Sequence, residues 1–201
     1  CNTNGLPVAD HYSSAYDIAL MSKELYQYEE THEWFTTWQS SITVGLPGKE
    51  KEFGLTNTNK LIKQYQGCNG IKTGFTTDAG YCLSASATRE DTHLIAVALG
   101  CETSQIRNTE VSKLLDYGFA NFETCVIAEK GQAIEEIRVE NGQPQTLKAV
   151  TADRITCLTE KGGKGDISSK AKIAEYPLVA EISVEKASFG ELAKRLVKKI
   201  F

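Results

Sequence analysis

The residues best suited to chemistry stand in one short run, 70–81, whose centre is the triplet Lys72-Thr73-Gly74. An ammonium, a hydroxyl and a residue without a side chain follow one another there. On an extended strand, Lys72 and Gly74 share one face and Thr73 takes the other. Lys72 can attract a carboxylate, and Thr73 can donate a hydrogen bond to it where the strand ends or twists. Gly74 lets a substrate backbone come close because it has no Cβ. The triplet therefore predicts a site for a substrate with a carboxylate.

The order lysine, threonine, glycine is also the third signature of the penicillin-binding proteins and class A β-lactamases, after S-x-x-K and an S-x-N type triplet. The surrounding sequence resembles one branch of these proteins, the D-alanyl-D-alanine carboxypeptidases of low molecular mass. The resemblance is carried by residues 4–7, 11–17, 57–61 and 80–87, together with Tyr65, Gly67 and Gly70. It runs from the first residues to about Phe122, and the remainder looks like the family's β-rich second domain.

This resemblance implies acyl transfer through a serine, whose proton is taken by a lysine within hydrogen-bond reach. The implied enzyme is a serine-type D-Ala-D-Ala carboxypeptidase of peptidoglycan maturation, which removes the terminal D-alanine of stem peptides without metal or cofactor. Lys72, Thr73 and Gly74 would form its catalytic strand, with Lys72 and Thr73 binding and polarising the substrate carboxylate. The backbone near Phe75 and Thr76 would bind the substrate by supplying an oxyanion N–H. β-Lactams would acylate the serine of the complete enzyme.

Arg107 is a further candidate for binding the substrate. The carboxypeptidases carry an arginine at the matching place, and a guanidinium can hold a terminal carboxylate through two parallel hydrogen bonds. A carboxypeptidase must distinguish a free C-terminus from a peptide bond, so such a clamp is expected chemistry. The alternative interpretation is a surface arginine on a helix, paired with Glu110 three residues on.

The serine nucleophile itself is not expected within this chain. The resemblance places both S-x-x-K and S-x-N upstream of residues 4–7, and no S-x-N triplet occurs in the sequence. Two S-x-x-K matches, Ser169/Lys172 and Ser183/Lys186, follow the K-T-G triplet and so stand in the wrong order. The chain therefore looks like the C-terminal part of a carboxypeptidase, and we expect it to be inactive by itself.

Two other classes of function stay open. A β-lactamase-like hydrolase shares the K-T-G triplet, although the run 57–81 and the expected β domain after Phe122 favour the carboxypeptidase. A non-catalytic module that binds peptidoglycan or another protein fits a chain that has no nucleophile.

Composition and cysteine spacing limit the remaining classes. The chain has 201 residues, 41% of them hydrophobic and 24% charged, which is typical of a globular protein. The net charge of −4 argues against a nucleic-acid partner. None of the six cysteines forms a C-x-x-C, so a metal site is not expected. Small buried hydrophobic residues are the main interpretation of the cysteines, and a Cys68–Cys82 disulfide is the second. The resemblance implies work outside the cytoplasmic membrane, although no stretch has the pattern of a signal peptide.

Hydrophobic periodicity predicts the elements that position these residues. A helix at 15–28 should begin at an N-cap, Ser14, and bury Ile18, Met21, Leu25 and Tyr28. A short helix at 33–39 should pack Trp34, Phe35 and Trp38 inward, and 40–58 should be loops. A short helix at 60–66 precedes the K-T-G strand. Alternation predicts a strand at 81–88, an apolar run predicts a strand at 94–99 buried on both faces, and three adjacent antiparallel strands result. Helical spacing returns over 104–122.

The expected fold class is α+β. Residues 1–122 should form an incomplete serine transpeptidase/β-lactamase-like domain of antiparallel strands with helices. Residues 123–185 should form a small β domain, with strands at 126–128, 133–139 and 154–158 and a surface loop at 160–172. Residues 186–201 should form a basic amphipathic helix. The segment 188–201 suits the surface of an anionic membrane, which would place the protein in the cell envelope, peripheral at the outer face of the cytoplasmic membrane.

Overall fold

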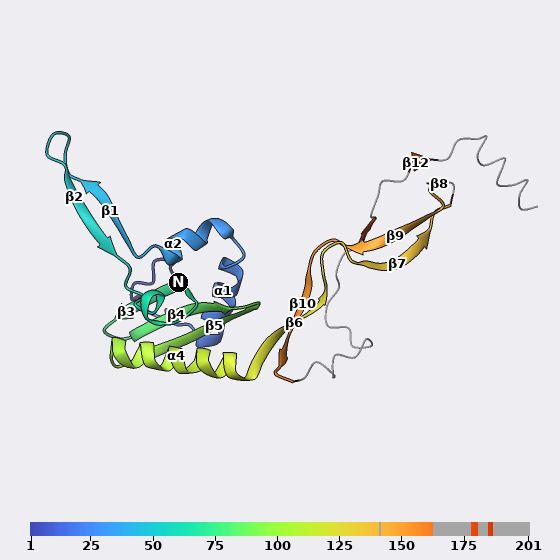
Figure 1. Ribbon diagram of the computed structural model, residues 1–201. Helices are drawn as coiled ribbons and strands as arrows, with labels where there is room; N and C mark the ends of the chain where they lie inside the picture. Colours follow the sequence, from blue (N-terminus) through green and yellow to red (C-terminus); the bar gives the residue numbers. More distant parts are fainter. Residues whose placement is uncertain (141, 163–177, 181–184, 187–201) are drawn as a thin grey trace, which may run out of the picture. The chain divides into compact units, whose positions relative to one another are not determined.

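The computed structural model describes residues 1–140, 142–162, 178–180 and 185–186 (Figure 1). The chain divides into two units, Cys1–Glu123 and Thr124–Phe201, and each is considered by itself. Several predictions lie outside the described residues: most of the loop 160–172, Ser169 and Ser183 of the two S-x-x-K matches, and the helix of 186–201 beyond Lys186.

A three-stranded antiparallel sheet of order β3-β4-β5 organises the first unit. Its strands are β3 (Cys68–Thr76), β4 (Gly80–Arg89) and β5 (Thr92–Cys101). The central strand β4 directs Leu83, Ala85 and Ala87 to one face, and Ser84 and Ser86 to the other. This sheet confirms the three adjacent antiparallel strands and the α+β fold class predicted from the sequence.

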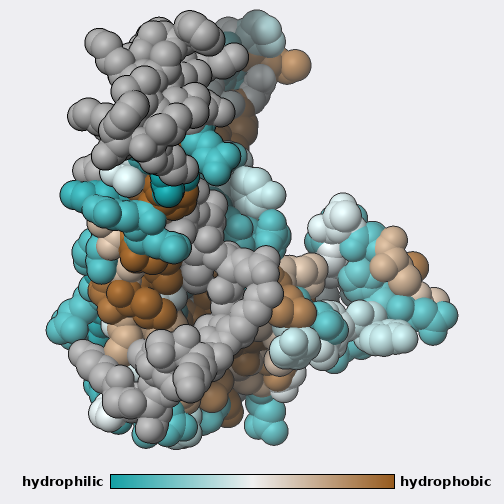
Figure 2. Space-filling model, turned by 90° about the vertical axis from the view of Figure 1, so that its right-hand side faces the viewer, coloured by the Kyte–Doolittle hydropathy of each residue, from teal (hydrophilic) through white to brown (hydrophobic). Residues whose placement is uncertain are grey.

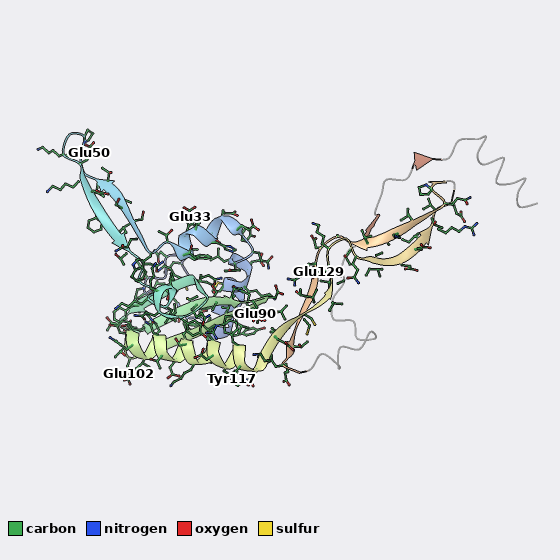
Figure 3. All side chains as sticks on the ribbon, viewed as in Figure 1. Glu33, Glu50, Glu90, Glu102, Tyr117 and Glu129 are labelled. Atoms are coloured by element: carbon green, nitrogen blue, oxygen red, sulfur yellow. The ribbon has the colours of Figure 1, made fainter. Side chains whose placement is uncertain are left out.

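Helix α4 (Ser104–Asn121) covers the Leu83 face of the sheet. The helix starts where the periodicity predicts, because the Thr103 hydroxyl caps it by accepting from the Ile106 N–H. Its buried apolar residues are Val111, Leu115 and Phe119, which pack on the small alanines of β4. A Cβ at Gly118 would lie only 2.5 Å from Leu94 Cδ1, so glycine lets this helix approach β5 closely. Figure 3 labels Glu102, just before this helix, and Tyr117, near its end.

Helix α1 (Ala15–Leu25) lies against the opposite face. Its predicted cap is confirmed, since Ser14 Oγ accepts from the Asp17 N–H at 3.1 Å and the Asp17 carboxylate accepts from the Ser14 N–H. Its predicted apolar face is wrong at three of its four positions, because Met21, Leu25 and Tyr28 are exposed, whereas Ile18 is half-buried. The helix turns Ser22 toward the sheet instead, where the Ser22 and Ser84 hydroxyls meet at 2.7 Å. A polar residue thus takes the inner position, and the apolar stripe beside it faces outward.

Short helices follow, η1 (Glu29–Thr31) and α2 (His32–Thr36). The inward packing predicted for three aromatic residues is wrong for Trp34, which is 70% exposed. A helix of five residues has a single inward side, and Phe35 occupies it against Gly70. Helix α3 (Leu61–Gln64) is the short helix predicted before the K-T-G strand.

Most of the stretch 40–58, predicted as loops, forms an exposed hairpin that protrudes from the first unit (Figure 1). Strands β1 (Gln39–Val44) and β2 (Lys51–Thr56) pair antiparallel, with Ile42 opposite Phe53. The loop prediction is wrong because two of the glycines that indicated it, Gly45 and Gly48, lie in the tip, where Figure 3 labels Glu50. The alternation of apolar residues on both sides of that tip specifies two strands.

An aromatic stack joins α1 and α2 to the sheet. The Tyr26 ring stacks on His32 at 4.2 Å and on His93 at 4.0 Å between ring centroids. His93 Nδ1 shares a hydrogen bond of 2.8 Å with the Thr88 hydroxyl, and His93 Nε2 is buried without a partner in the described part of the chain. Burial lowers the pKa of His93, and His32 lowers it further. His93 is therefore packed as a neutral ring.

The second unit is built from short strands in its described part. Strand β6 (Phe122–Ala128) pairs with β10 (Ile155–Glu160), and β8 (Gly142–Gln143) pairs with β12 (Glu185–Lys186). A three-stranded sheet has the order β11-β9-β7, from Leu178–Ala180, Thr146–Thr151 and Ala133–Arg138. Strand β9 was not predicted, although it buries Ala149 and Val150. Figure 2 shows brown apolar patches between teal hydrophilic residues on the face turned to the viewer.

All six cysteines are free, so the second interpretation, a Cys68–Cys82 disulfide, is wrong. Cys68 lies opposite Ala87 at one end of the β3–β4 ladder, whereas Cys82 lies opposite Gly74 near the other end. These positions are six residues apart along the strand, or roughly 20 Å, beyond the reach of a disulfide. The interpretation as buried hydrophobic residues holds fully for Cys125, whereas Cys1 is exposed and the other four are half-buried.

Candidate active site

The K-T-G triplet lies on the edge strand of the sheet, because β4 is the single neighbour of β3 among the strands that the structure describes. Lys72 lies opposite Ser84 and Gly74 opposite Cys82, so both point to the same face. The Lys72 side chain is exposed, and its Nζ donates to the Thr73 carbonyl oxygen at 2.8 Å. The ammonium is thereby held beside the backbone of the next residue while it stays open to solvent.

Thr73 is the buried member of the triplet, with 9% of its surface exposed. Its hydroxyl lies 2.5 Å from the hydroxyl of Thr58, which belongs to the loop between β2 and α3. Thr58 itself is exposed. Within the described residues, the Thr73 hydroxyl thus has one hydrogen-bond partner, which comes from a different part of the chain.

Two asparagines fix the loop that carries Thr58. Asn59 is buried, and its side chain donates to the Gly70 carbonyl oxygen of β3 at 2.9 Å while it accepts from the Leu61 N–H. The Asn57 side chain donates to the Thr37 carbonyl oxygen at 3.0 Å and accepts from the Asn59 N–H. In the sequence, this N-T-N run was recognisable only as part of the family resemblance. Asparagines on both sides of a hydroxyl were the signal for a fixed loop.

Phe75 and Thr76 continue β3 beyond the triplet. Phe75 is 58% exposed, and its ring lies against Tyr81 on β4 at 4.4 Å between centroids. The Thr76 hydroxyl accepts from the Ala79 N–H at 3.0 Å and so closes the turn into β4. The Thr76 side chain therefore has a role in the turn, and only its backbone is a candidate for the oxyanion N–H.

Arg107 is buried, with 5% of its surface exposed. Its Nε and Nη2 donate to Asn108 Oδ1 at 3.1 and 2.9 Å. The alternative, an ion pair between Arg107 and Glu110, is wrong, because Glu110 pairs with Lys113 at 2.8 Å. Burial lowers the pKa of Arg107, and the neighbouring Cys101 raises it.

Some of the candidate residues contact one another, and others only lie near the K-T-G strand. Lys72 and Thr73 are in direct contact through the 2.8 Å hydrogen bond. Arg107 lies near Tyr81 and Cys82, which raise the pKa of its guanidinium electrostatically. These two residues of β4 pair with Phe75 and Gly74 of β3. An exposed ammonium, a hydroxyl and a buried guanidinium are the groups that bind carboxylates most strongly. In the described ranges, no group of three or more His, Cys, Asp or Glu residues could hold a metal ion, and no helix is long and apolar enough to cross a membrane.

Two family models match the sequence. The model of D-alanyl-D-alanine carboxypeptidases matches residues 1–103, and that of the C-terminal domain of penicillin-binding protein 5 matches residues 122–187. This chain belongs to the D-alanyl-D-alanine carboxypeptidase family, as the residues around the K-T-G triplet indicated.

Individual relatives agree with this family. The D-alanyl-D-alanine carboxypeptidase DacF of Bacillus subtilis is 34% identical over 221 residues, covering 96% of this chain and 56% of that protein. DacA of Haemophilus influenzae is 32% identical over 187 residues, covering 90% of this chain and 46% of that protein. The solved structure of penicillin binding protein 5 from Haemophilus influenzae is similar at a TM-score of 0.62 and 28% identity, covering 90% of this chain and 57% of that one. The chain thus spans about half the length of the relatives it matches.

Proposed function

We propose that this chain supplies the carboxylate-binding part of a serine-type D-Ala-D-Ala carboxypeptidase of peptidoglycan maturation. The observation that carries the proposal is the open K-T-G edge strand. Lys72 is exposed beside Thr73, and a Cβ at Gly74 would meet only the Cys82 Cβ, at an ordinary 3.8 Å. Since the described fold does not require a glycine at position 74, an approaching substrate explains it better.

The proposed chemistry divides among the site residues. Lys72 and Arg107 offset the charge of the terminal D-alanine carboxylate, and the Thr73 hydroxyl donates to it. The backbone near Phe75 and Thr76 stabilises the oxyanion that forms as a serine attacks the preceding carbonyl. That serine and its lysine come from the complete enzyme, and β-lactams would acylate the same serine. The residues of this chain hold the substrate for attack.

The test is the release of D-alanine from a diacyl-L-Lys-D-Ala-D-Ala peptide by the protein with all sequence that precedes Cys1 in its gene. Turnover that benzylpenicillin abolishes is the expected result. Lys72→Ala should remove most of it, whereas Lys63→Ala, an exposed lysine on α3, should leave it unchanged. Release of penicilloate faster than release of D-alanine would identify a β-lactamase-like hydrolase instead. Binding of peptidoglycan without any turnover would identify a non-catalytic module.

We also propose that the protein works at the outer face of the cytoplasmic membrane, held there through residues 188–201. The support is the sequence pattern alone, in which apolar residues recur at helical spacing between Lys194, Arg195, Lys198 and Lys199.

A further inference from the structure

We infer that Thr58 is a positioning residue that supplies the hydrogen bond orienting the Thr73 hydroxyl toward the substrate carboxylate. This inference rests on the proposed function and adds a residue to it. The observation is the 2.5 Å contact between the two hydroxyl oxygens. Thr73 is buried, so its hydroxyl has little water to turn to, whereas Thr58 is exposed.

The direction of this hydrogen bond follows from counting protons. A threonine hydroxyl has one proton to donate and two lone pairs to accept with, and a carboxylate can only accept. If Thr73 donated to Thr58, it would have no proton left for the substrate. Thr58 must therefore donate to Thr73 when the carboxylate is bound, and Thr73 donates its own proton onward. In such a chain each hydrogen bond polarises the next.

Lys72 cannot replace Thr58 in this role. Its Nζ donates to the Thr73 carbonyl oxygen and not to the Thr73 hydroxyl. The two donors thus act on different atoms of Thr73.

The loop around Thr58 is built to hold its position. Asn59 ties the loop to the Gly70 carbonyl of β3, the same strand that carries Thr73. Asn57 ties it to the Thr37 carbonyl on the other side. Because both neighbours are fixed, Thr58 needs to lose little further freedom to keep its hydroxyl on Thr73. This pre-organisation suits a role in substrate binding, since an exposed threonine contributes little to folding.

The test compares Thr58→Val, which keeps the shape and removes the donor, with Thr58→Ser, which keeps the hydroxyl, in the full-length protein. For a peptide ending in free D-Ala-D-Ala, Thr58→Val should lower kcat/KM about threefold to tenfold, the usual range for one neutral hydrogen bond. Thr58→Ser should restore it to within about twofold. For the same peptide with an amidated C-terminus, Thr58→Val should change nothing. Thr43→Val, an exposed threonine on β1, is the matched control.

The outcomes separate this inference from the proposed function. Release of D-alanine by the wild type tests the function alone. If the wild type is active, equal kcat/KM in Thr58→Val, or equal losses on the free and amidated peptides, overturns the role of Thr58. If the wild type is inactive, the proposed function fails, and NMR titration with the free peptide decides the inference. Equal affinity of wild type and Thr58→Val would then refute it, and weaker binding that Thr58→Ser restores would support it.

Discussion

The two candidate cations of the site carry the same charge in opposite settings. Lys72 is exposed, and its ammonium carries three N–H donors. Arg107 is buried, and its planar guanidinium is held by Asn108. An exposed cation attracts a carboxylate from a distance, and a fixed planar guanidinium recognises its shape. The two residues should therefore respond differently when the carboxylate is removed from the substrate.

The first prediction concerns these two cations in the full-length protein. Lys72→Ala and Arg107→Ala should each lower kcat/KM about tenfold to a hundredfold, since a hydrogen bond to a charged group contributes roughly 1.5–3 kcal/mol. Arg107→Lys keeps the charge but not the fork, and it should recover only part of the loss. A substrate with an amidated C-terminus should be nearly insensitive to Arg107→Ala. Equal losses on both substrates would show that Arg107 supports the fold and not the clamp.

A second prediction concerns His93 and pH. Because the folded protein holds the pKa of His93 below its ordinary value, the unfolded chain takes up this proton first as the pH falls. The stability that neutral His93 contributes is present above about pH 6.5 and is lost as the pH falls toward the folded pKa. The melting temperature should therefore drop between about pH 7.5 and pH 5.5. His93→Phe, which stacks but cannot titrate, should reduce this drop. An identical drop in His93→Phe would contradict the assignment.

At the scale of elements, α4 and β4 make the platform on which the edge strand rests. Leu115 and Leu114 are neighbours on α4 with opposite settings, 1% and 50% exposed. Leu115→Ala should destabilise the protein by roughly 2–5 kcal/mol, because it leaves a cavity against β4. Leu114→Ala should change the unfolding free energy by about 0.5 kcal/mol or less. Urea unfolding followed by tryptophan fluorescence measures both. Similar losses in the two variants would mean that α4 is not seated as described.

Local patterns predicted the elements beside the site well, because each has a strong period or cap of its own. The capping pair Ser14 and Asp17 indicates the start of α1, and the alternation of residue types around Leu83 predicts β4. The inner face of α1 was missed because a Ser22–Ser84 contact across 62 residues decides it. The β1–β2 hairpin was missed because its glycines indicated a loop more strongly than its apolar alternation indicated strands.

In the candidate site, too, local patterns were predictable and contacts between distant residues were not. Residue types alone indicated Lys72 and Thr73 as carboxylate ligands, and their roles remain predictions. The partnership of Thr58 with Thr73 spans 15 residues and depends on how the loop after β2 folds back on β3. Such a contact between distant residues leaves no periodic mark in a sequence.

At the scale of the whole molecule, the membrane proposal gives a further prediction. Full-length protein should bind vesicles that contain anionic lipid, since each basic residue near the surface contributes about 1 kcal/mol. Binding should weaken from about 0.05 to 0.5 M salt and disappear when residues 188–201 are deleted. Lys194→Glu should weaken it more than Lys130→Glu, a change in the second unit at a lysine paired with Asp153. Equal binding to neutral vesicles, or unchanged binding after the deletion, would favour a helix packed on the protein.

The protruding hairpin has a mechanical consequence. Strand β2 ends at Thr56, and only Asn57 separates it from Thr58, so roughly 7 Å of chain connects an exposed arm to the hydroxyl pair. Asn57 and Asn59 leave this connection without slack. The position of the exposed arm and the position of the hydroxyl pair are therefore tied to one another through a single anchored residue, Asn57.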